Sequence, residues 1–211
     1  DGRGDLLVGE PYSISSVHSG SAWILSGANG SVIRVATGAS PGDQFGSRVG
    51  NMGDVDGDGV PDYAAGALPY PPASSYVRIY SGSTGALIRT HSVGSSGSGP
   101  YGFRISAAGD ANSDGRADYL LASPFTNNSN GVVQLISGLN GSIIRTHVGS
   151  GSGEFGQGLC RLDDLNADGR PEYAIGAPRV LNLGEVKIFS GVDGVLLRTL
   201  ACPFQSPSPM F

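Results

Sequence analysis

The sequence predicts an all-β protein built from repeated four-stranded units, and three observations support this prediction. Glycine and proline are abundant, with 35 Gly and 13 Pro among the 211 residues. Two different sequence markers recur in the same frame along the chain, and acidic loops of fixed spacing interrupt the apolar runs in that frame. We therefore expect a β-propeller, in which the units are blades stacked around an axis.

The composition favours strands and excludes some functions. Glycine and proline together make up about 23% of the residues, against roughly 12% in average proteins. Such a composition suits short strands joined by tight turns and disfavours helices. The net charge of −5 argues against a nucleic-acid partner. No apolar run approaches the ~20 residues that span a membrane, and no signal peptide is visible.

The first marker is an aromatic residue followed by glycine. The pairs are Phe45-Gly46, Tyr101-Gly102 and Phe155-Gly156, spaced by 56 and 54 residues, and the N-terminus reads as a further copy without its front. This marker divides one propeller region, residues 1–211, into repeats. Their approximate bounds are 1–44, 45–100, 101–154 and 155–211.

The second marker is Ser-Gly-x-x-Gly, at 26–30, 81–85, 137–141 and 190–194. Apolar runs flank each copy, which predicts a β-hairpin around a glycine-rich turn. In the second repeat we expect four strands, at approximately 47–53, 62–67, 76–81 and 86–91. A β-sandwich with accidental similarity is the alternative, and two markers in one frame argue against it.

An acidic loop lies between the first and second predicted strands of each repeat. Oxygen-bearing side chains occupy loop positions 1, 3, 5 and 9, with glycine at position 6. In chain order they are Asp54, Asp56, Asp58 and Asp62; Asp110, Asn112, Asp114 and Asp118; Asp164, Asn166, Asp168 and Glu172.

This spacing predicts calcium sites. Ca²⁺ takes six to eight oxygen ligands at roughly 2.3–2.6 Å, and alternate residues of a tight loop can point their oxygens at one centre. Position 7 then offers a backbone carbonyl, from Val60, Arg116 or Arg170. We expect three complete sites and a fourth, truncated one that retains Asp1, Arg3 and Asp5.

Two other readings of the acidic loops are possible. An EF-hand needs a glutamate at position 12, where this chain has Ala65, Leu121 and Ile175 in strand-like runs. A solvated Asp/Asn/Gly turn without a metal is the second alternative. Arg3, Gly4 and Asp5 spell an integrin-recognition tripeptide, but they occupy loop positions 7 to 9 and are better explained as part of the loop.

The combination of aromatic-Gly, acidic loop and Gly-Ala-Pro resembles the FG-GAP repeats of integrin α subunits and of bacterial secreted proteins. The third and fourth repeats match at Ser123-Pro124 and Gly176–Pro178, whereas the second departs slightly at Gly66–Pro69. The resemblance covers essentially the whole chain. It implies a propeller, usually seven-bladed, with calcium in the hairpin loops, and the similarity among the repeats suggests a secreted bacterial member.

The function expected is that of a secreted or cell-surface binding or scaffold module for a protein or glycan ligand. A sugar-binding lectin and a non-catalytic part of a secreted enzyme are the alternatives. We expect partners to bind the variable connections at 69–75, 124–130 and 178–184, or the grooves between blades. Both chain ends fall within the repeat frame, which predicts flanking repeats or self-association.

No catalytic set is predicted, and the chain is expected not to be an enzyme. His91 and His147 occupy matching positions at strand ends and are expected to be exposed. For Cys160 and Cys202 we expect buried free thiols, with a single disulfide as the alternative.

Overall fold

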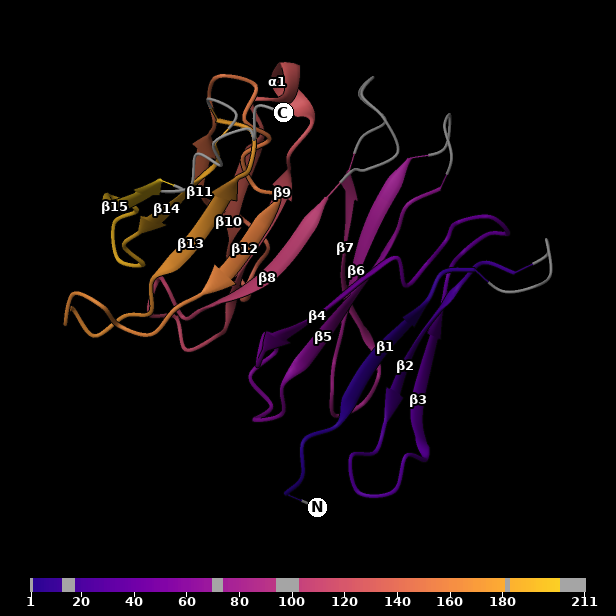
Figure 1. The fold of residues 1–211 in the computed structure, drawn as a ribbon. Coiled ribbons are helices and arrows are strands. Elements are labelled where there is room, and N and C mark those ends of the chain that lie inside the picture. Colours follow the sequence, from indigo (N-terminus) through magenta and orange to yellow (C-terminus); the bar gives the residue numbers. More distant parts are fainter. Residues whose placement is uncertain (1, 13–17, 70–73, 94–102, 181–182, 202–211) are drawn as a thin grey trace, which may run out of the picture.

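The computed structural model describes residues 2–12, 18–69, 74–93, 103–180 and 183–201 (Figure 1). These residues form one three-stranded and three four-stranded antiparallel sheets, in which consecutive strands pair. The prediction of an all-β chain of four-stranded units is confirmed.

Each sheet is one blade, and its strands run in chain order. The first blade contains β1 (Leu6–Glu10), β2 (Ser21–Leu25) and β3 (Val32–Thr37). The second contains β4 (Arg48–Gly53), β5 (Asp62–Ala67), β6 (Ser75–Tyr80) and β7 (Leu87–Val93). The third contains β8 (Arg104–Gly109), β9 (Asp118–Ser123), β10 (Val132–Ile136) and β11 (Ile143–Val148). The fourth contains β12 (Gly158–Arg161), β13 (Tyr173–Ala177), β14 (Glu185–Phe189) and β15 (Leu196–Ala201).

The four strands expected in the second repeat are found within two residues at each end. A short helical turn, α1 (Thr126–Ser129), was not expected and lies in the connection between β9 and β10. Two of its residues, Asn127 and Asn128, have positive φ, so α1 is a local turn and not a regular helix. Within the described residues, no helix is long and apolar enough to span a membrane.

The blades stack face to face. The first strands of successive blades contact each other, β4 with β8 and β8 with β12 (Figure 1). Three clusters of buried side chains fill the three interfaces between blades, and β5 is buried at every position because both its faces are covered. Stacking of this kind buries a continuous core that no single blade could form alone.

The aromatic-glycine marker fastens each blade to the one before it. Phe45 is fully buried, and its N–H donates to the carbonyl of Ser19 in the first blade at 2.9 Å. Gly46 has φ of +90°, and a side chain on it would meet the Ser21 carbonyl oxygen at 2.1 Å. Phe155 repeats the contact through an N–H bond to the carbonyl of Asn130.

The second copy of this marker along the chain, Tyr101-Gly102, lies outside the described residues. Next to it, Phe103 is fully buried, and its ring fills the space beside Gly66 of the second blade. A Cβ atom on Gly66 would lie 2.1 Å from that ring, so the glycine of the Gly-Ala segment is required by close packing between blades.

In the first three blades, an arginine on the outer strand reaches the Ser-Gly-x-x-Gly turn of the next blade. Arg34 donates to the carbonyl of Thr84 at 2.7 Å, and Arg145 donates to the carbonyl of Gly191 at 3.0 Å. Arg89 donates to the carbonyl of Gly138 at 3.1 Å. The sequence did not show these contacts, because the partners are 46 to 50 residues away.

Two expectations about single residues are wrong. His91 and His147 are half-buried between blades, where each Nε2 lies 2.6 and 2.7 Å from the hydroxyl of Tyr119 and Tyr173, respectively. Cys160 is free but exposed on β12, because the face that carries it is not covered by described residues. Cys202 lies outside the described residues.

Candidate metal centres

The acidic loops join the first and second strands of each blade, β4 to β5, β8 to β9 and β12 to β13. In an antiparallel meander this end also carries the turn between the third and fourth strands. The turns and the loops are indeed in contact, since the N–H of Gly82 donates to Asp62 and the hydroxyl of Ser137 donates to Asp114. The connection that holds α1 lies at the opposite end of the blade (Figure 1).

The carboxylate at loop position 9 is buried and holds the loop together. In the third blade, Oδ2 of Asp118 accepts from the backbone N–H groups of Ala111 and Asn112, at 2.9 and 3.3 Å. Its Oδ1 accepts from the N–H of Gly138 in the hairpin turn at 3.0 Å. Asp118 thus ties the acidic loop to the neighbouring turn of the same blade.

The same arrangement recurs in the second blade and in part in the first. Asp62 accepts from Val55 at 2.7 Å, from Asp56 at 3.1 Å and from Gly82 at 2.9 Å. In the first blade, Asp5 accepts from the N–H of Gly27 at 3.1 Å. The sequence predicted metal ligands at these positions and not this backbone contact. A carboxylate oxygen has two lone pairs, so the role as a ligand stays a prediction.

Burial raises the pKa of Asp118 and of Asp62. The pKa of Asp118 is raised to about 6 by desolvation, although the hydrogen bonds from Gly138 and Ala111 act in the opposite direction. The pKa of Asp62 is raised for the same reason. A nearby cation would favour the ionised form of both groups.

Loop positions 1, 3 and 5 bring oxygens together in the second blade. Carboxylate oxygens of Asp54, Asp56 and Asp58 lie within 4.8 Å of one another. Asp54 accepts from the backbone N–H groups of Gly57 and Gly59, so the loop curls around its first residue. The predicted convergence of these three side chains is found.

The third loop is connected internally through its asparagine. The amide of Asn112 donates to Oδ2 of Asp114 at 2.9 Å, and the same oxygen accepts from the hydroxyl of Ser137 at 3.2 Å. Asp110 accepts from the N–H of Gly115 at 3.0 Å, as Asp54 does from Gly59. Side-chain and backbone donors therefore already surround the oxygens of this loop.

The fourth loop leaves one buried oxygen without a partner. Carboxylate oxygens of Asp164, Asp168 and Glu172 lie within 4.8 Å of one another, and Glu172 is completely buried. Its Oε2 accepts from the N–H of Leu165, whereas its Oε1 has no hydrogen-bond partner. A buried, unpaired carboxylate oxygen is costly, and a cation between these three residues would satisfy it. The donor set of this loop therefore fits a hard divalent cation.

Asn166 and Asp168 repeat the contacts of the third loop. The amide of Asn166 donates to Oδ2 of Asp168 at 2.8 Å, and Oδ1 of Asp168 accepts from the N–H of Arg170. The pKa of Asp164 is lowered, chiefly by the N–H of Gly169. Asp164 is thus held in its ionised form, as a metal ligand must be.

The backbone of each loop is left-handed at two positions. Position 6 is the expected glycine, with φ of +87° at Gly59 and Gly169. Position 4 is left-handed too, at Gly57, Ser113 and Ala167, with φ of 73°, 63° and 63°. The sequence did not predict the left-handed backbone at position 4, because the residue there varies between blades.

Position 7 has a role that the sequence did not predict. The guanidinium of Arg116 lies against Gly57, where a Cβ atom would sit 1.3 Å from Nη1. Arg170 donates to the carbonyl of Asp110 at 3.0 Å. These arginines reach from one blade into the acidic loop of the preceding blade, whereas Val60 is exposed. Coordination by the position 7 carbonyls stays a prediction.

The truncated N-terminal loop is described only in part. Asp1 lies outside the described residues, Gly2 has the φ of +82° typical of loop position 6, and Arg3 and Asp5 are exposed. Asp5 and Gly2 show that this segment follows the same backbone course as the other loops.

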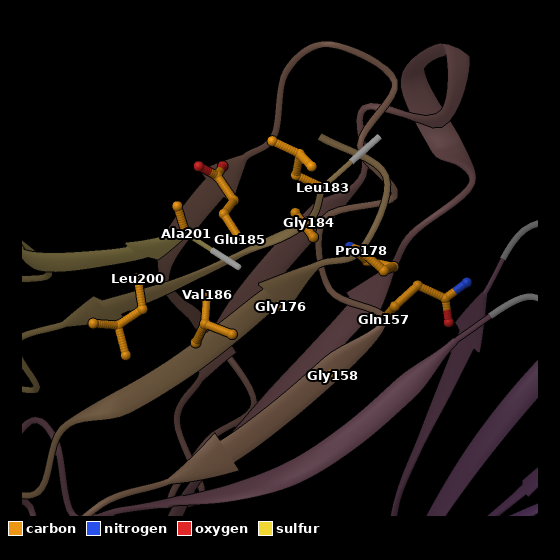
Figure 2. A pocket seen from close by; sticks show the side chains of 11 residues that line it. Gln157, Gly158, Gly176, Pro178, Leu183, Gly184, Glu185, Val186, Leu200 and Ala201 are labelled. Atoms are coloured by element: carbon orange, nitrogen blue, oxygen red, sulfur yellow. The ribbon is translucent and has the colours of Figure 1, made fainter. Parts of the chain in front are cut away.

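An apolar groove of about 560 Å³ lies on the fourth blade (Figure 2). Gly176, Pro178, Val186 and Leu200 contribute to its lining. Gly176, one of the lining residues, corresponds to Gly66 of the second blade, which is covered by the ring of Phe103. The groove is therefore the uncovered form of a face that is packed elsewhere in the protein.

Comparisons with known proteins agree with the repeat pattern. No protein-family model matches the chain. In sequence, the chain is similar to human integrin α-11, with 27% identity over 154 residues. It is also similar to integrin α pat-2 of Caenorhabditis briggsae and of Caenorhabditis elegans, with 27% identity over 146 residues in each case.

These similarities are partial. They cover 64% of the chain and 13% of human integrin α-11, and 60% of the chain and 12% of each nematode protein. Among solved structures, the Dos1 propeller matches 94% of the chain and 57% of its own, with a TM-score of 0.47 and 10% identity. The strand pairing, and not this distant likeness, identifies the fold. The repeated markers, the stacked blades and the similarity to integrin α subunits together support an integrin α-like β-propeller.

Proposed function

We propose that the chain is an extracellular binding module whose blades are stabilised by Ca²⁺ and whose partner is a protein on a cell surface or in a matrix. The similarity to integrin α subunits supports the class of function. The observation that carries the calcium part is the buried Oε1 of Glu172, which lacks a hydrogen-bond partner beside Asp164 and Asp168.

Calcium would be held by the oxygens of positions 1, 3, 5 and 9 and by the carbonyl at position 7. When bound, it neutralises carboxylates that otherwise repel one another. The protein's part is to hold these oxygens close, through the left-handed backbone at positions 4 and 6 and through the N–H groups that orient Asp54 and Asp164. Calcium is therefore proposed as a structural cation.

Partner binding is proposed for the end of the blades opposite the acidic loops. The loops are near-copies of each other, whereas the connections at the other end differ in sequence between blades. Arg179, in the connection from β13 to β14, has a side chain that is 72% exposed, although it pairs with Glu154 at 2.9 Å. Phe125 is half-buried beside α1, and Tyr70 lies outside the described residues. Variable loops on a rigid scaffold commonly carry specificity.

A glycan-binding function would need a polar aromatic groove that recurs between blades. The described interfaces do not repeat such a groove, because His91 and His147 fill the equivalent positions at two of them. The only tryptophan, Trp23, is half-buried and donates to Glu10 at 3.0 Å. A protein ligand is therefore the better-supported partner.

The test combines metal binding with adhesion. Calorimetric titration of the metal-free chain with CaCl₂ should show saturable binding, reduced by one site in E172Q and unchanged in the exposed-residue control D163N. Cells should adhere to surfaces coated with the chain, and R179A should weaken this adhesion.

Two outcomes would contradict the proposal. Absence of calcium binding would remove the cation from the function. Adhesion that survives protease treatment of the cells but is lost after glycosidase treatment would assign a glycan ligand.

A further inference from the structure

The interface between the first and second blades lacks a histidine that is present at the other two described interfaces. The outer strands β3, β7 and β11 are aligned by their pairing with β2, β6 and β10. In this alignment Ala36, which pairs with Ala22, corresponds to His91 and His147, which pair with Val77 and Val133.

The histidines make the same contact at both of their interfaces. Each imidazole bonds through Nε2 to the hydroxyl of the tyrosine that follows the position 9 acid in the next blade, at 2.6 Å for Tyr119 and 2.7 Å for Tyr173. His147 also packs on Phe189, with ring centroids 4.2 Å apart. The imidazole ring is thus held by a hydroxyl and by an aromatic face.

The pair of stacked aromatic rings that could hold such a ring is also present at the interface with Ala36. Tyr63 and Tyr80 stack at 5.3 Å with an interplanar angle of 16°, as Tyr173 and Phe189 stack at 5.8 Å and 20°. Arg34 donates to the carbonyls of Ser83 and Thr84, and Arg145 donates to those of Gly191 and Val192. The arginine thus reaches the same turn at both interfaces, but Arg34 bonds one residue further along it.

The space that the histidine fills elsewhere is open here. A groove of about 470 Å³ lies at this interface, and its lining includes Arg34, Ala36, Thr37, Tyr63, Tyr80 and Thr84. Tyr63 and Tyr80 are only 6% and 8% exposed. Within the described part of the chain, neither hydroxyl has a hydrogen-bond partner. Two largely buried tyrosines therefore present unpaired hydroxyls to this groove.

We propose that the groove between the first and second blades binds an imidazole ring supplied from outside the chain. The ring occupies the position that corresponds, at this interface, to that of the His147 imidazole. It accepts a hydrogen bond from the hydroxyl of Tyr63 and packs on the ring of Tyr80. Tyr80 stands where the third interface has Phe189, so it adds a second hydroxyl toward the ligand. The chemistry fits a histidine side chain of a protein partner or a small free imidazole, and it is separate from the acidic loops.

The experiment is a titration of the full chain with imidazole, followed through the ring signals of Tyr63 and Tyr80 in NMR spectra. Saturable shifts of these signals are expected. Y63F should weaken binding by about fivefold, the factor typical of one hydrogen bond. The matched control is Y119F, because the Tyr119 hydroxyl is already bonded to His91, and it should leave imidazole binding unchanged.

A filling variant gives a second, independent readout. A36H places the missing ring in the groove, so it should abolish imidazole binding and raise the melting temperature. Titration with the peptides Gly-His-Gly and Gly-Phe-Gly separates the sources of the ligand. Tighter binding of the histidine peptide than of free imidazole assigns a protein side chain, and the reverse order assigns a small heterocycle.

Three results would overturn the inference. The first is the absence of saturable shifts at tyrosines 63 and 80. The second is equal binding of imidazole by the wild type, Y63F and A36H. The third is equal binding of the phenylalanine and histidine peptides, which would show that the groove does not select a hydrogen-bonding ring.

Discussion

The third and fourth acidic loops share one sequence pattern but satisfy their buried carboxylate in different ways. Asp118 uses both oxygens, since Oδ1 accepts from Gly138 of the hairpin turn and Oδ2 accepts from the loop itself. Glu172 is longer by one methylene group, and its Oε1 is buried without a partner. The hairpin turns of the two blades lie equally close to the acidic loops. A Cβ atom on Gly138 would lie 2.1 Å from the carbonyl oxygen of Ala117, and one on Gly191 would lie 2.1 Å from that of Pro171.

The comparison indicates that one methylene group determines whether backbone donors satisfy both oxygens of the buried carboxylate. With aspartate, backbone donors satisfy the carboxylate, and the loop can hold its shape without a metal. With glutamate, the carboxylate extends toward Asp164 and Asp168, and an unpaired oxygen remains. We therefore expect the two loops to depend on calcium to different degrees.

The largest effect is expected for D118A. Removal of this carboxylate leaves the buried N–H groups of Ala111, Asn112 and Gly138 without their acceptor, which should cost about 3 kcal/mol in the free energy of unfolding. Urea denaturation in EGTA measures this change, and the exposed-residue variant D163A should stay within about 0.5 kcal/mol of the wild type. A D118A protein as stable as D163A would refute the backbone role of Asp118.

Calcium itself should have the next largest effect. A cation that binds only the folded state adds about 2.7 kcal/mol at a hundredfold excess over its Kd. The melting temperature should fall in EGTA, and the fall should be smaller in E172Q than in the wild type. Identical melting curves with calcium and with EGTA would contradict a stabilising role for the ion.

Exchange of the two acids tests the comparison directly. E172D should place the carboxylate where Asp118 sits and allow a hydrogen bond from Gly191, which raises the metal-free stability by about 1 kcal/mol. The same variant should respond less to calcium. Denaturation of E172D and of the reverse variant D118E, each in EGTA, measures the exchange; if E172D is no more stable than the wild type, the unpaired oxygen is not the source of the difference.

The smallest effect concerns the interface between the same two blades. Desolvation, with Arg145 as a further cause, lowers the pKa of His147 to about 4, while Tyr173 and Phe189 face the ring from the next blade. A lowered folded-state pKa means that the unfolded chain binds the proton more readily. Stability should therefore fall as the pH drops from about 6.5 to about 4.

The variant H147Q isolates this effect, because it removes the titrating ring but retains a hydrogen-bonding side chain. Its unfolding free energy should fall less than that of the wild type over this pH range. The raised pKa of Asp118 acts in the opposite direction, since its ionised form is disfavoured in the folded state. It is present in both proteins, so the difference between them reports on His147. The variant H18Q, changed at an exposed residue, is the control. If the unfolding free energy has the same slope against pH in the wild type, H147Q and H18Q, His147 does not contribute.

The sequence predicted the strands well because two markers and the acidic loops fix each blade locally. The strands β4 to β7 begin and end within two residues of the predicted positions. The contacts between blades were not predictable in this way. The partner of His91 is 28 residues away, and whether a strand face is covered depends on the next blade.

The candidate metal loops were predicted as groups of four oxygen-bearing side chains, and the structure brings three acids together in each of two loops, without Asp62 in the second blade. Their role as metal ligands stays a prediction. What the spacing could not show is how the oxygens are already used. The burial of Asp62, Asp118 and Glu172 depends on the turn of the neighbouring hairpin, which no pattern within the loop encodes. The left-handed backbone at Ser113 and Ala167 was hidden because neither residue is a glycine.

The arginine contacts give the array a direction. Arg34, Arg89 and Arg145 each point from one blade to the turn carbonyls of the blade that follows, and Phe45 and Phe155 point back toward the blade that precedes. The two faces of a blade are thus different and complementary, as in a heterologous contact. Because the described blades share these arginine and backbone contacts, a gene duplication that inserts or removes one whole repeat leaves these contacts matched. The number of repeats can therefore change during evolution without the loss of these contacts.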